Sequence, residues 1–492
     1  MTTTSEHELG IAKPLIDGGW LEHTSRGSID HVNPATGRVN GAVALSGPDE
    51  VDAAVAAAKA AYPAWRAMPG DQRGHILLRI AELVSRELEP LGRTTTLELG
   101  HPLFTSIGLS YLCASWFGYY AGWCDKIEGS TVPLTGANSG FDFTLLEPYG
   151  VVGIILTWNG PMVSVGMKVA PALAAGNCVV LKTPEPASYT VARFAELALE
   201  AGLPPGVLHV LPGGGEAGDR LVRHPDVHKI SFTGGIGTAR KIMVAASETL
   251  TPLVFELGGK SANIVFADAD LEAAANMTVS SCYALAGQGC VVSTRLLVER
   301  PIYDGVVSTT ARKVANLVVG DPFAKETAIG PVVSKDAHQR ILSVIDGARS
   351  SGAGRVVTGG SAVDRVRLPA ANADGFFIEP TVFADVAPGS ALAQQEVFGP
   401  VMAIIPFDGE DEAVAIANGT SYGLGTFLHT RDLARVHRLV PRLESGTVSV
   451  NGATSLPPAA PFGGYKQSGF GREGGKEGLM EFLQVKNVHI NF

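Results

Sequence analysis

Cys290 is the residue best suited to covalent chemistry in this sequence. It follows Gly287-Gln288-Gly289, and glycines beside a thiol leave the backbone uncovered, so a carbonyl group could reach both the sulfur and the adjacent main-chain N–H. Glu256 lies upstream between apolar residues and a Gly258-Gly259 pair, a pattern that predicts a turn. Because apolar surroundings raise a carboxyl pKa towards the range of a general base, the pair predicts covalent catalysis followed by hydrolysis.

The remaining cysteines and the histidines indicate no other reactive site. The other four cysteines, at positions 113, 124, 178 and 282, lack C-x-x-C spacing and the density of a disulfide scaffold, so we interpret them as packing residues in a reducing compartment. The twelve histidines show no metal-ligand spacing, so no metal is expected.

Composition excludes several classes of protein. A chain of 492 residues with 46% hydrophobic and 17% charged residues predicts several globular domains. A net charge of -10 without a basic cluster argues against nucleic-acid binding and favours small-molecule partners. The amino terminus has no secretory pattern and no long apolar run occurs, so we expect a cytoplasmic protein without membrane contact.

Short apolar strands alternate with helices in two series that must position these residues. This alternation predicts parallel, doubly wound sheets in two α/β domains. In the first series we expect strands at 151–156, 178–181, 207–211 and 229–232 and helices at 161–175 and 188–201. In the second we expect strands at 262–266, 294–298, 355–357, 401–407 and 447–450 and helices at 271–286, 302–317, 335–351, 411–418 and 433–440.

Outside these series, helices expected at 48–67, 71–91 and 105–124 would cover the first sheet. An alternating strand at 141–147 could protrude and pair with the alternating tail at 481–492 or with another subunit. An oligomer follows from this interpretation.

Two glycine clusters could bind phosphate. Residues 213–218 fit G-x-G-x-x-G after a strand, but the best acidic candidate, Glu185, precedes the motif where a standard Rossmann fingerprint has it about 20 residues later. Either the match is chance or the cofactor is held differently. The second cluster, residues 232–237, also follows a strand and opens a helix, so its N–H groups could face a pyrophosphate.

Seven ordered blocks of the chain resemble the aldehyde dehydrogenase superfamily over nearly its whole length. They are residues 157–159 (TWN), 181–185 (LKTPE), 232–234 (FTG), 256–260 (ELGGK), 287–290 (GQGC), 396–401 (EVFGPV) and 461–469 (PFGGYKQSG). The resemblance implies a Rossmann-like, doubly wound cofactor domain (1–124 and 148–257), an α/β catalytic domain (258–472) and a small β oligomerisation domain (125–147 and 473–492). It also implies a homodimer or homotetramer.

By this resemblance Cys290 is the nucleophile, Asn159 and the Cys290 N–H hold the oxyanion, Glu256 activates water and Lys168 supports the network. The implied cofactor is NAD, with NADP possible. Lys182 and Glu185 would hold the adenosine ribose, Gly215 would approach the adenine, and Glu396 with Phe398 would position the nicotinamide half. The full implied cofactor set is Ile155, Trp158, Lys182, Glu185, Gly215, Phe232, Thr233, Gly234, Gly235, Leu257, Glu396 and Phe398.

The sequence departs from the family pattern at three positions. Gly235 replaces a usual serine, which removes a side-chain donor to the pyrophosphate, whereas Gly160 and Met167 replace larger aromatic residues and should widen the substrate tunnel. Residues 452–462, which by resemblance line the tunnel mouth, carry no charge. We therefore expect apolar medium-chain or aromatic aldehydes as substrates. The alternatives are a CoA-acylating or semialdehyde dehydrogenase of the same family, and a catalytically silent binding protein on this scaffold.

Overall fold

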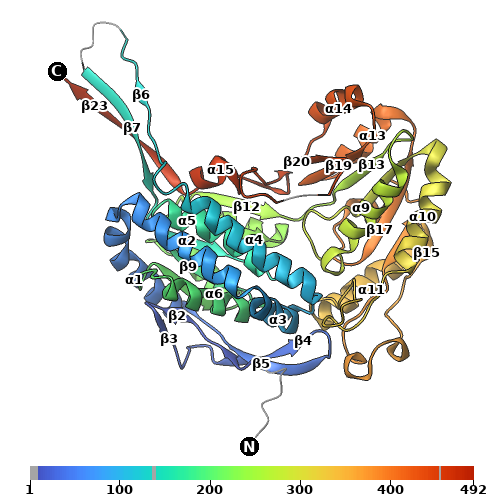
Figure 1. Ribbon diagram of the computed structural model, residues 1–492, viewed down its shortest axis with the longest axis horizontal. Coiled ribbons are helices and arrows are strands. Elements are labelled where there is room, and N and C mark those ends of the chain that lie inside the picture. The colour runs from blue at the N-terminus through green and yellow to red at the C-terminus, as the bar shows by residue number, and fades with distance from the viewer. Residues whose placement is uncertain (1–8, 136–139, 454–455) are drawn as a thin grey trace, which may run out of the picture.

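The computed structural model describes residues 9–135, 140–453 and 456–492, so the predictions about residues 1–8 lie outside the described part of the chain. Two α/β lobes lie side by side, and a narrow arm projects from one of them (Figure 1). The doubly wound α/β class predicted from the sequence is confirmed.

The first lobe is built on an eight-stranded sheet of order β22-β12-β11-β8-β9-β10-β2-β3. Its five central strands are parallel. They are β8 (Val151–Ile155), β9 (Cys178–Thr183), β10 (Leu208–Pro212), β11 (Lys229–Gly234) and β12 (Leu253–Leu257). Antiparallel edge strands are β2 (Leu15–Ile16), β3 (Gly19–Trp20) and β22 (Gly469–Phe470). The strand β12, which carries Glu256, was not predicted.

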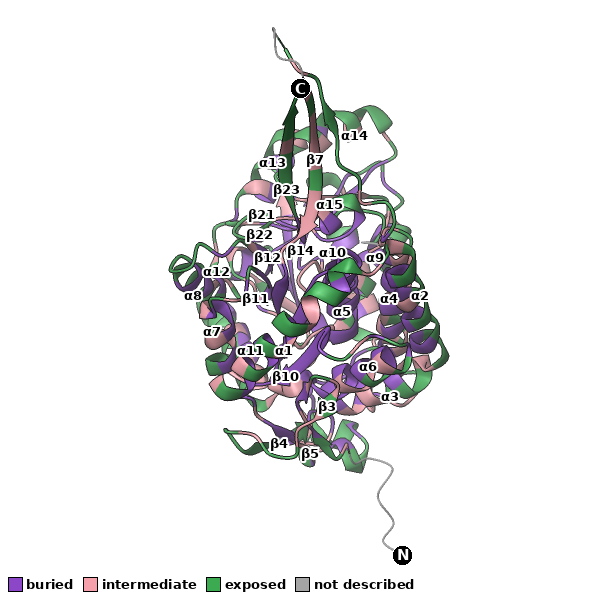
Figure 2. Cartoon of the chain, turned by 90° about the vertical axis from the view of Figure 1, so that its left-hand side faces the viewer, coloured by how far each residue is buried: buried purple, intermediate pink, exposed green. Residues whose placement is uncertain are grey.

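Helices cover both faces of this sheet, which explains why its parallel strands are apolar throughout. Those packed on or near it are α1 (Pro48–Ala67), α5 (Pro161–Ala174), α6 (Tyr189–Glu200), α7 (Gly215–Arg223) and α8 (Ile236–Ala246). An outer layer of α2 (Gly70–Arg86), α3 (Leu88–Leu99) and α4 (Leu103–Ala121) packs against α5 and α6. The central strands lie buried between these helical layers (Figure 2).

The helix predicted over 71–91 is two helices, α2 and α3, that meet at Glu87. Pro90 explains the break, because it has no N–H to donate to the carbonyl four residues earlier.

The second lobe contains a seven-stranded sheet of order β15-β16-β17-β14-β13-β19-β20. Only β15 (Arg355–Thr358) is antiparallel to its neighbour. The parallel strands are β13 (Ala262–Val265), β14 (Arg295–Glu299), β16 (Thr381–Ala384), β17 (Val401–Phe407), β19 (Gly425–His429) and β20 (Thr447–Val450). The main helices are α9 (Leu271–Tyr283), α10 (Tyr303–Ala315), α11 (Lys335–Ser350), α13 (Gly409–Asn418) and α14 (Leu433–Leu439).

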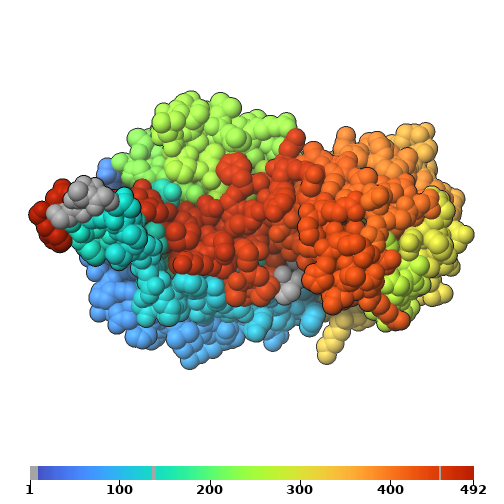
Figure 3. Space-filling model, turned by 90° about the horizontal axis from the view of Figure 1, so that it is seen from above, coloured from blue at the N-terminus to red at the C-terminus, as the bar shows by residue number. Residues whose placement is uncertain are grey.

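The carboxyl-terminal segment links the two lobes. It crosses from the second lobe onto the first (Figure 3), where β22 pairs with β12 beside Glu256. The predicted domain boundaries remain a prediction. The strand β22 lies within the predicted catalytic domain (258–472) but belongs to the sheet of the first lobe.

The projecting arm confirms the predicted pairing of the tail with the strand near residue 141. The strand β7 (Gly140–Pro148) pairs antiparallel with β23 (Leu483–Asn491) over its whole length, and β6 (Thr131–Val132) lies on the other side of β7. Large apolar side chains on this arm, including Phe141 and Val485, are exposed.

Candidate active site

A cavity of about 210 Å³ lies where the carboxyl ends of β8, β11 and β12 meet the second lobe. The carboxyl edge of a parallel sheet is the usual ligand site of doubly wound folds. Its lining comes from both lobes and consists of Thr157, Trp158, Asn159, Thr233, Gly234, Gly235, Glu256, Leu257, Gly258, Cys290, Glu396 and Phe398. The fold therefore brings together the predicted nucleophile, base and amide donor with seven predicted cofactor residues.

Cys290 follows a strained turn rather than a long helix. The helix predicted to reach Ala286 ends at Tyr283, and Leu285 and Ala286 have φ of 52° and 54°. Gly287 has φ of +73°, and a Cβ there would lie 2.1 Å from the Gly399 carbonyl oxygen. The glycine at 287 is thus required by the close approach of two backbones, and strain of this kind is common at functional sites.

Glu256 lies on β12, not in a turn as the sequence suggested. Its side chain is 4% exposed, and among the described residues its Oε1 has no hydrogen-bond partner. Burial raises its pKa to about 8, the charge of Glu473 adds to the rise, and Lys168 opposes it. The carboxyl group is therefore poised to exchange a proton near neutral pH.

The Cys290 thiol is held protonated by its surroundings. Burial raises its pKa well above the ordinary value, and the negative charges of Glu256 and Glu396 add to this effect. A thiolate at this position therefore requires a compensating positive charge beside the sulfur.

Asn159 has a fixed orientation in the loop after β8. Its Nδ2 donates to the Gln288 carbonyl oxygen at 3.0 Å, which leaves the second N–H of the amide available to a substrate oxygen. Gln288 is fixed in turn, because its Oε1 accepts from the Val333 N–H at 3.0 Å.

Lys168 lies behind Glu256 on α5 and is paired with a residue that the sequence did not indicate. Its Nζ donates to Ser231 Oγ at 2.9 Å and forms a buried ion pair with Glu473. Lys168 and Glu473 are 305 residues apart, so no local pattern could have predicted the pair. Burial is the main cause of the raised pKa of Glu256, and the charges of Glu473 and Lys168 shift that pKa in opposite directions.

The other predicted cofactor residues lie along the same sheet edge, outside the small cavity. Ile155 ends β8, and Lys182 is the penultimate residue of β9. Glu185 begins the short 3-10 turn Glu185–Ala187, Gly215 begins α7, and Phe232 packs on Phe255 beneath Gly234. Burial lowers the pKa of Lys182, an effect that Glu185 opposes.

The helix ends along this sheet edge have room for a dinucleotide. A Cβ at Gly215 or Gly235 would meet no atom within 4 Å, so open space lies in front of the first turns of α7 and α8. Main-chain N–H groups at two helix N-termini suit a pyrophosphate. Glu396, whose pKa burial raises to about 7, accepts from the Gly259 N–H at 3.0 Å and lies beside Phe398, whose ring contacts Trp158.

Over residues 9–135, 140–453 and 456–492 we find no group of three or more His, Cys, Asp or Glu side chains that could hold a metal ion. Within the same ranges no helix is long and apolar enough to cross a membrane.

The chain is similar to known proteins over most of its length. It is 40% identical over 481 residues to betaine aldehyde dehydrogenase of Sinorhizobium fredii, covering 97% of each chain. It is also 40% identical over 482 residues to human mitochondrial aldehyde dehydrogenase, covering 97% of this chain and 91% of that protein. The NAD+ complex of an aldehyde dehydrogenase from Bacillus cereus superimposes with a TM-score of 0.94 at 36% identity, covering 98% and 96% of the two chains.

A family profile gives the same result, since residues 20–488 match that of the aldehyde dehydrogenase family. With the cysteine, the amide and the buried glutamate gathered at one sheet edge, the chain belongs to the aldehyde dehydrogenase family.

Proposed function

We propose that this enzyme oxidises an aldehyde to a carboxylate with NAD through a thioester on Cys290. The observation that carries the proposal is the convergence of the Cys290 thiol, the Asn159 amide and the Glu256 carboxyl group on one cavity between the lobes. A silent binding protein would have no need to bury a glutamate with an unpartnered oxygen beside a thiol.

In this mechanism the Cys290 thiol loses its proton to solvent, its sulfur bonds to the aldehyde carbon, and the new oxyanion accepts hydrogen bonds from the Asn159 side chain and the Cys290 N–H. Bound NAD would supply the hydride acceptor and the positive charge that favours the thiolate. The carboxylate of Glu256 then takes a proton from water, and the hydroxide attacks the thioester and releases the acid. Lys168 and Glu473 tune the proton affinity of Glu256 throughout.

The cofactor assignment depends on Glu185 and the glycines of α7 and α8. A carboxylate beside the adenosine ribose would accept from its hydroxyl groups and repel a 2'-phosphate, so we expect NAD to be preferred over NADP. The NAD+ complex of the Bacillus cereus relative supports this choice.

The substrate assignment depends on the space around Gly160. A Cβ at Gly160 would meet only Val163, at 4.0 Å, so this position leaves open space at the start of α5. Residues 452–453 and 456–462, the described part of the segment at the expected tunnel mouth, contain no charged side chain. Burying a substrate carboxylate there would cost several kcal/mol, whereas each buried CH₂ group contributes about 0.8 kcal/mol. Apolar medium-chain or aromatic aldehydes fit best.

A panel assay tests the proposal. Purified enzyme is mixed with NAD or NADP and with acetaldehyde, hexanal, benzaldehyde, succinic semialdehyde or betaine aldehyde, with and without CoA, and kcat/KM is measured for each. We expect hexanal or benzaldehyde with NAD to rank first and CoA to have no effect. A CoA requirement would indicate the acylating alternative, and a preference for succinic semialdehyde would refute the uncharged tunnel.

We further propose that the β7–β23 arm forms a subunit interface of a homodimer or homotetramer, and that the enzyme is cytoplasmic. The exposed apolar side chains of the arm support the first of these.

A further inference from the structure

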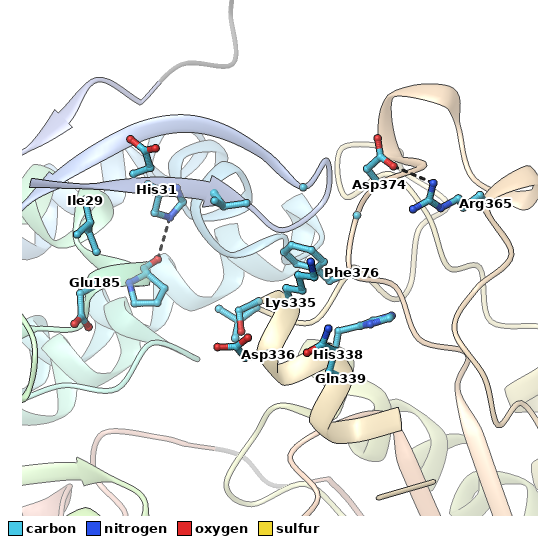
Figure 4. A pocket seen from close by; sticks show the side chains of 17 residues that line it. Ile29, His31, Glu185, Lys335, Asp336, His338, Gln339, Arg365, Asp374 and Phe376 are labelled. Carbon is cyan, nitrogen blue, oxygen red and sulfur yellow. Dashed lines mark hydrogen bonds and ion pairs between the residues drawn. The ribbon is translucent and has the colours of Figure 1, made fainter. Parts of the chain in front are cut away.

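Cavities also lie outside the candidate active site. One of about 650 Å³ lies between α11 and the amino-terminal hairpin, residues 28–44 (Figure 4). It adjoins Glu185 and therefore belongs with the cofactor site; His31 Nε2 lies 3.4 Å from the Pro186 carbonyl oxygen there. Another cavity, of about 610 Å³, lies at the base of the β7–β23 arm and shares no residue with the candidate active site.

This arm-base cavity lies where three helix ends meet the arm. Its lining comes from the start of α2, the segment that follows α4, the end of α5 and the last residues of β7. Arg73, in the first turn of α2, is the most buried charged residue of the lining, with 8% of its surface exposed. Its guanidinium donates through Nη1 to the Met68 carbonyl oxygen.

The other edge of the Arg73 guanidinium has no partner in the described part of the chain. Its Nε is buried without a hydrogen bond, and its Nη2 donates to no protein atom there. Nε and Nη2 form the edge of a guanidinium that can bind both oxygens of one carboxylate. Arg220 shows this geometry in the same protein, since its Nε and Nη2 donate to the two carboxylate oxygens of Asp52 at 2.6 and 2.8 Å.

The space beside the Arg73 guanidinium can hold an additional atom. Gly176, just after α5, has φ of +92° and no side chain to fill this space. A Cβ placed at Gly176 would lie 3.9 Å from Arg73 Nε, 3.8 Å from Arg73 Cζ and 3.7 Å from Pro148 Cγ. These are ordinary contact distances, so at least one further heavy atom fits against the guanidinium.

The charge of Arg73 also lacks a compensating negative charge. A guanidinium stays protonated near neutral pH. Burial lowers the pKa of Arg73, and of the ionisable groups around it only Cys124 opposes that fall. Burial raises the pKa of the Cys124 thiol to about 12, so this thiol is neutral.

The carboxyl groups that line the arm-base cavity have other partners or lie in water. Glu147 pairs with Arg66, Asp125 pairs with Lys126, and Asp71 is exposed. Because a buried charge without a partner is strongly unfavourable, an anion from outside the chain would be bound favourably at Arg73.

We propose that the arm-base cavity is a binding site for a small oxyanion, a phosphate or a carboxylate group, held by Arg73. Two oxygens of the anion would accept from Nε and Nη2, as those of Asp52 do from Arg220. The anion would lie near the end of β7, so its binding should stabilise the base of the arm. This inference is independent of the proposed function, because the two cavities share no residue.

Calorimetry on the NAD-saturated enzyme tests the site, because bound NAD keeps phosphate out of the cofactor site. Sodium phosphate or sodium acetate is titrated at pH 7.5 and constant ionic strength into the wild type, Arg73→Gln, Arg73→Lys and Arg220→Gln. Lysine keeps the charge but not the two parallel donors. Arg220→Gln is the matched control, because the Arg220 guanidinium already binds Asp52. The two probes distinguish a phosphate ligand from a carboxylate ligand.

We expect the wild type to bind one anion per subunit. Arg73→Lys should bind it about tenfold more weakly, the magnitude of one lost hydrogen bond to a charged group. Arg73→Gln should show no measurable binding, and Arg220→Gln should match the wild type. In thermal melting the anion should raise the melting temperature of the wild type more than that of Arg73→Gln, because a ligand stabilises the folded state that binds it.

The inference is overturned if the wild type binds neither probe, or if Arg73→Gln retains the affinity of the wild type. If the wild type binds neither probe and mass photometry shows smaller assemblies for Arg73→Gln, the guanidinium contacts a second copy of the chain instead. If Arg73→Gln does not fold, Arg73→Lys decides, since an affinity equal to that of the wild type would remove the Nε–Nη2 edge from the site.

Discussion

Replacing Glu256 by glutamine tests two effects of its buried carboxyl group, namely hydrolysis of the thioester and the loss of stability at alkaline pH. Glutamine has nearly the same shape but cannot ionise or accept a proton from water. We expect the variant to produce a burst of NADH equal to its active sites and then to stop, since acylation of Cys290 precedes the water step. We also expect it to be more stable than the wild type at alkaline pH.

The size of the stability effect follows from the pKa of Glu256. A rise from 4.5 to about 8 corresponds to about 5 kcal/mol at 1.36 kcal/mol per unit. Between these values the folded state binds more protons than the unfolded state, so stability falls as pH rises through this window and the full loss is present above pH 8. Water reaching the unpartnered Oε1 would reduce the loss, so we expect a difference on the order of 2 kcal/mol.

Stopped-flow absorbance of NADH measures the burst, and thermal melting from pH 5 to pH 9 measures stability. The melting temperature of Glu256→Gln should equal that of the wild type at pH 5 and exceed it by about 2 °C at pH 9. Glu326→Gln is the control, because Glu326 is exposed on a turn and should shift neither measurement. Loss of the burst would show that Glu256 acts before acylation, and equal melting curves at pH 9 would refute the buried-carboxylate reasoning.

Three further variants test the cofactor-binding residues Gly235 and Glu185 and the buried Lys168–Glu473 ion pair. Gly235→Ser should tighten NAD binding severalfold without changing the melting temperature, because its Cβ meets no atom within 4 Å and its hydroxyl adds a donor; unchanged affinity in calorimetry would contradict this. Lys168→Met leaves Glu473 buried without its partner and should destabilise the enzyme by about 3 kcal/mol in urea unfolding. It should also move the rise of kcat to higher pH, because Lys168 lowers the pKa of Glu256; an unmoved profile would argue against that link. Glu185→Gln should raise kcat/KM with NADP relative to NAD, and an unchanged ratio would remove Glu185 from cofactor selection.

The architecture was predictable because parallel strands covered on both faces are continuous apolar runs between helices. The strands at 151–156 and 401–407 were recognised in this way. The strand β12 was not, since Glu256 and the following glycines interrupt its pattern and resemble a turn. Pro90 marked the break between α2 and α3, but the helical pattern of apolar residues on both sides of it concealed the signal.

The candidate site, like the fold, could be predicted from the sequence only in part. The Cys290 and Glu256 blocks are short and contiguous, so residue types alone predicted their chemistry. Lys168 and Glu473 are 305 positions apart in the sequence, and His31 and Pro186 are 155 positions apart. Only the folded chain brings each pair into contact. The end of α9 at Tyr283 was not predicted either, because Ala284 to Ala286 have high helical propensity. In the structure Leu285 and Ala286 have positive φ, and Gly287 lies against the Gly399 carbonyl oxygen.

The central claim is that Cys290 carries the acyl group, and mass spectrometry tests it directly. Glu256→Gln enzyme is mixed with NAD and hexanal, quenched in acid during the burst, digested and analysed peptide by peptide. We predict one adduct, with the mass of hexanal less two hydrogen atoms, on the peptide that contains Cys290, and none in a Cys290→Ala/Glu256→Gln control. An adduct on Cys113, Cys124, Cys178 or Cys282, or NADH formation without any adduct, would contradict the thioester mechanism.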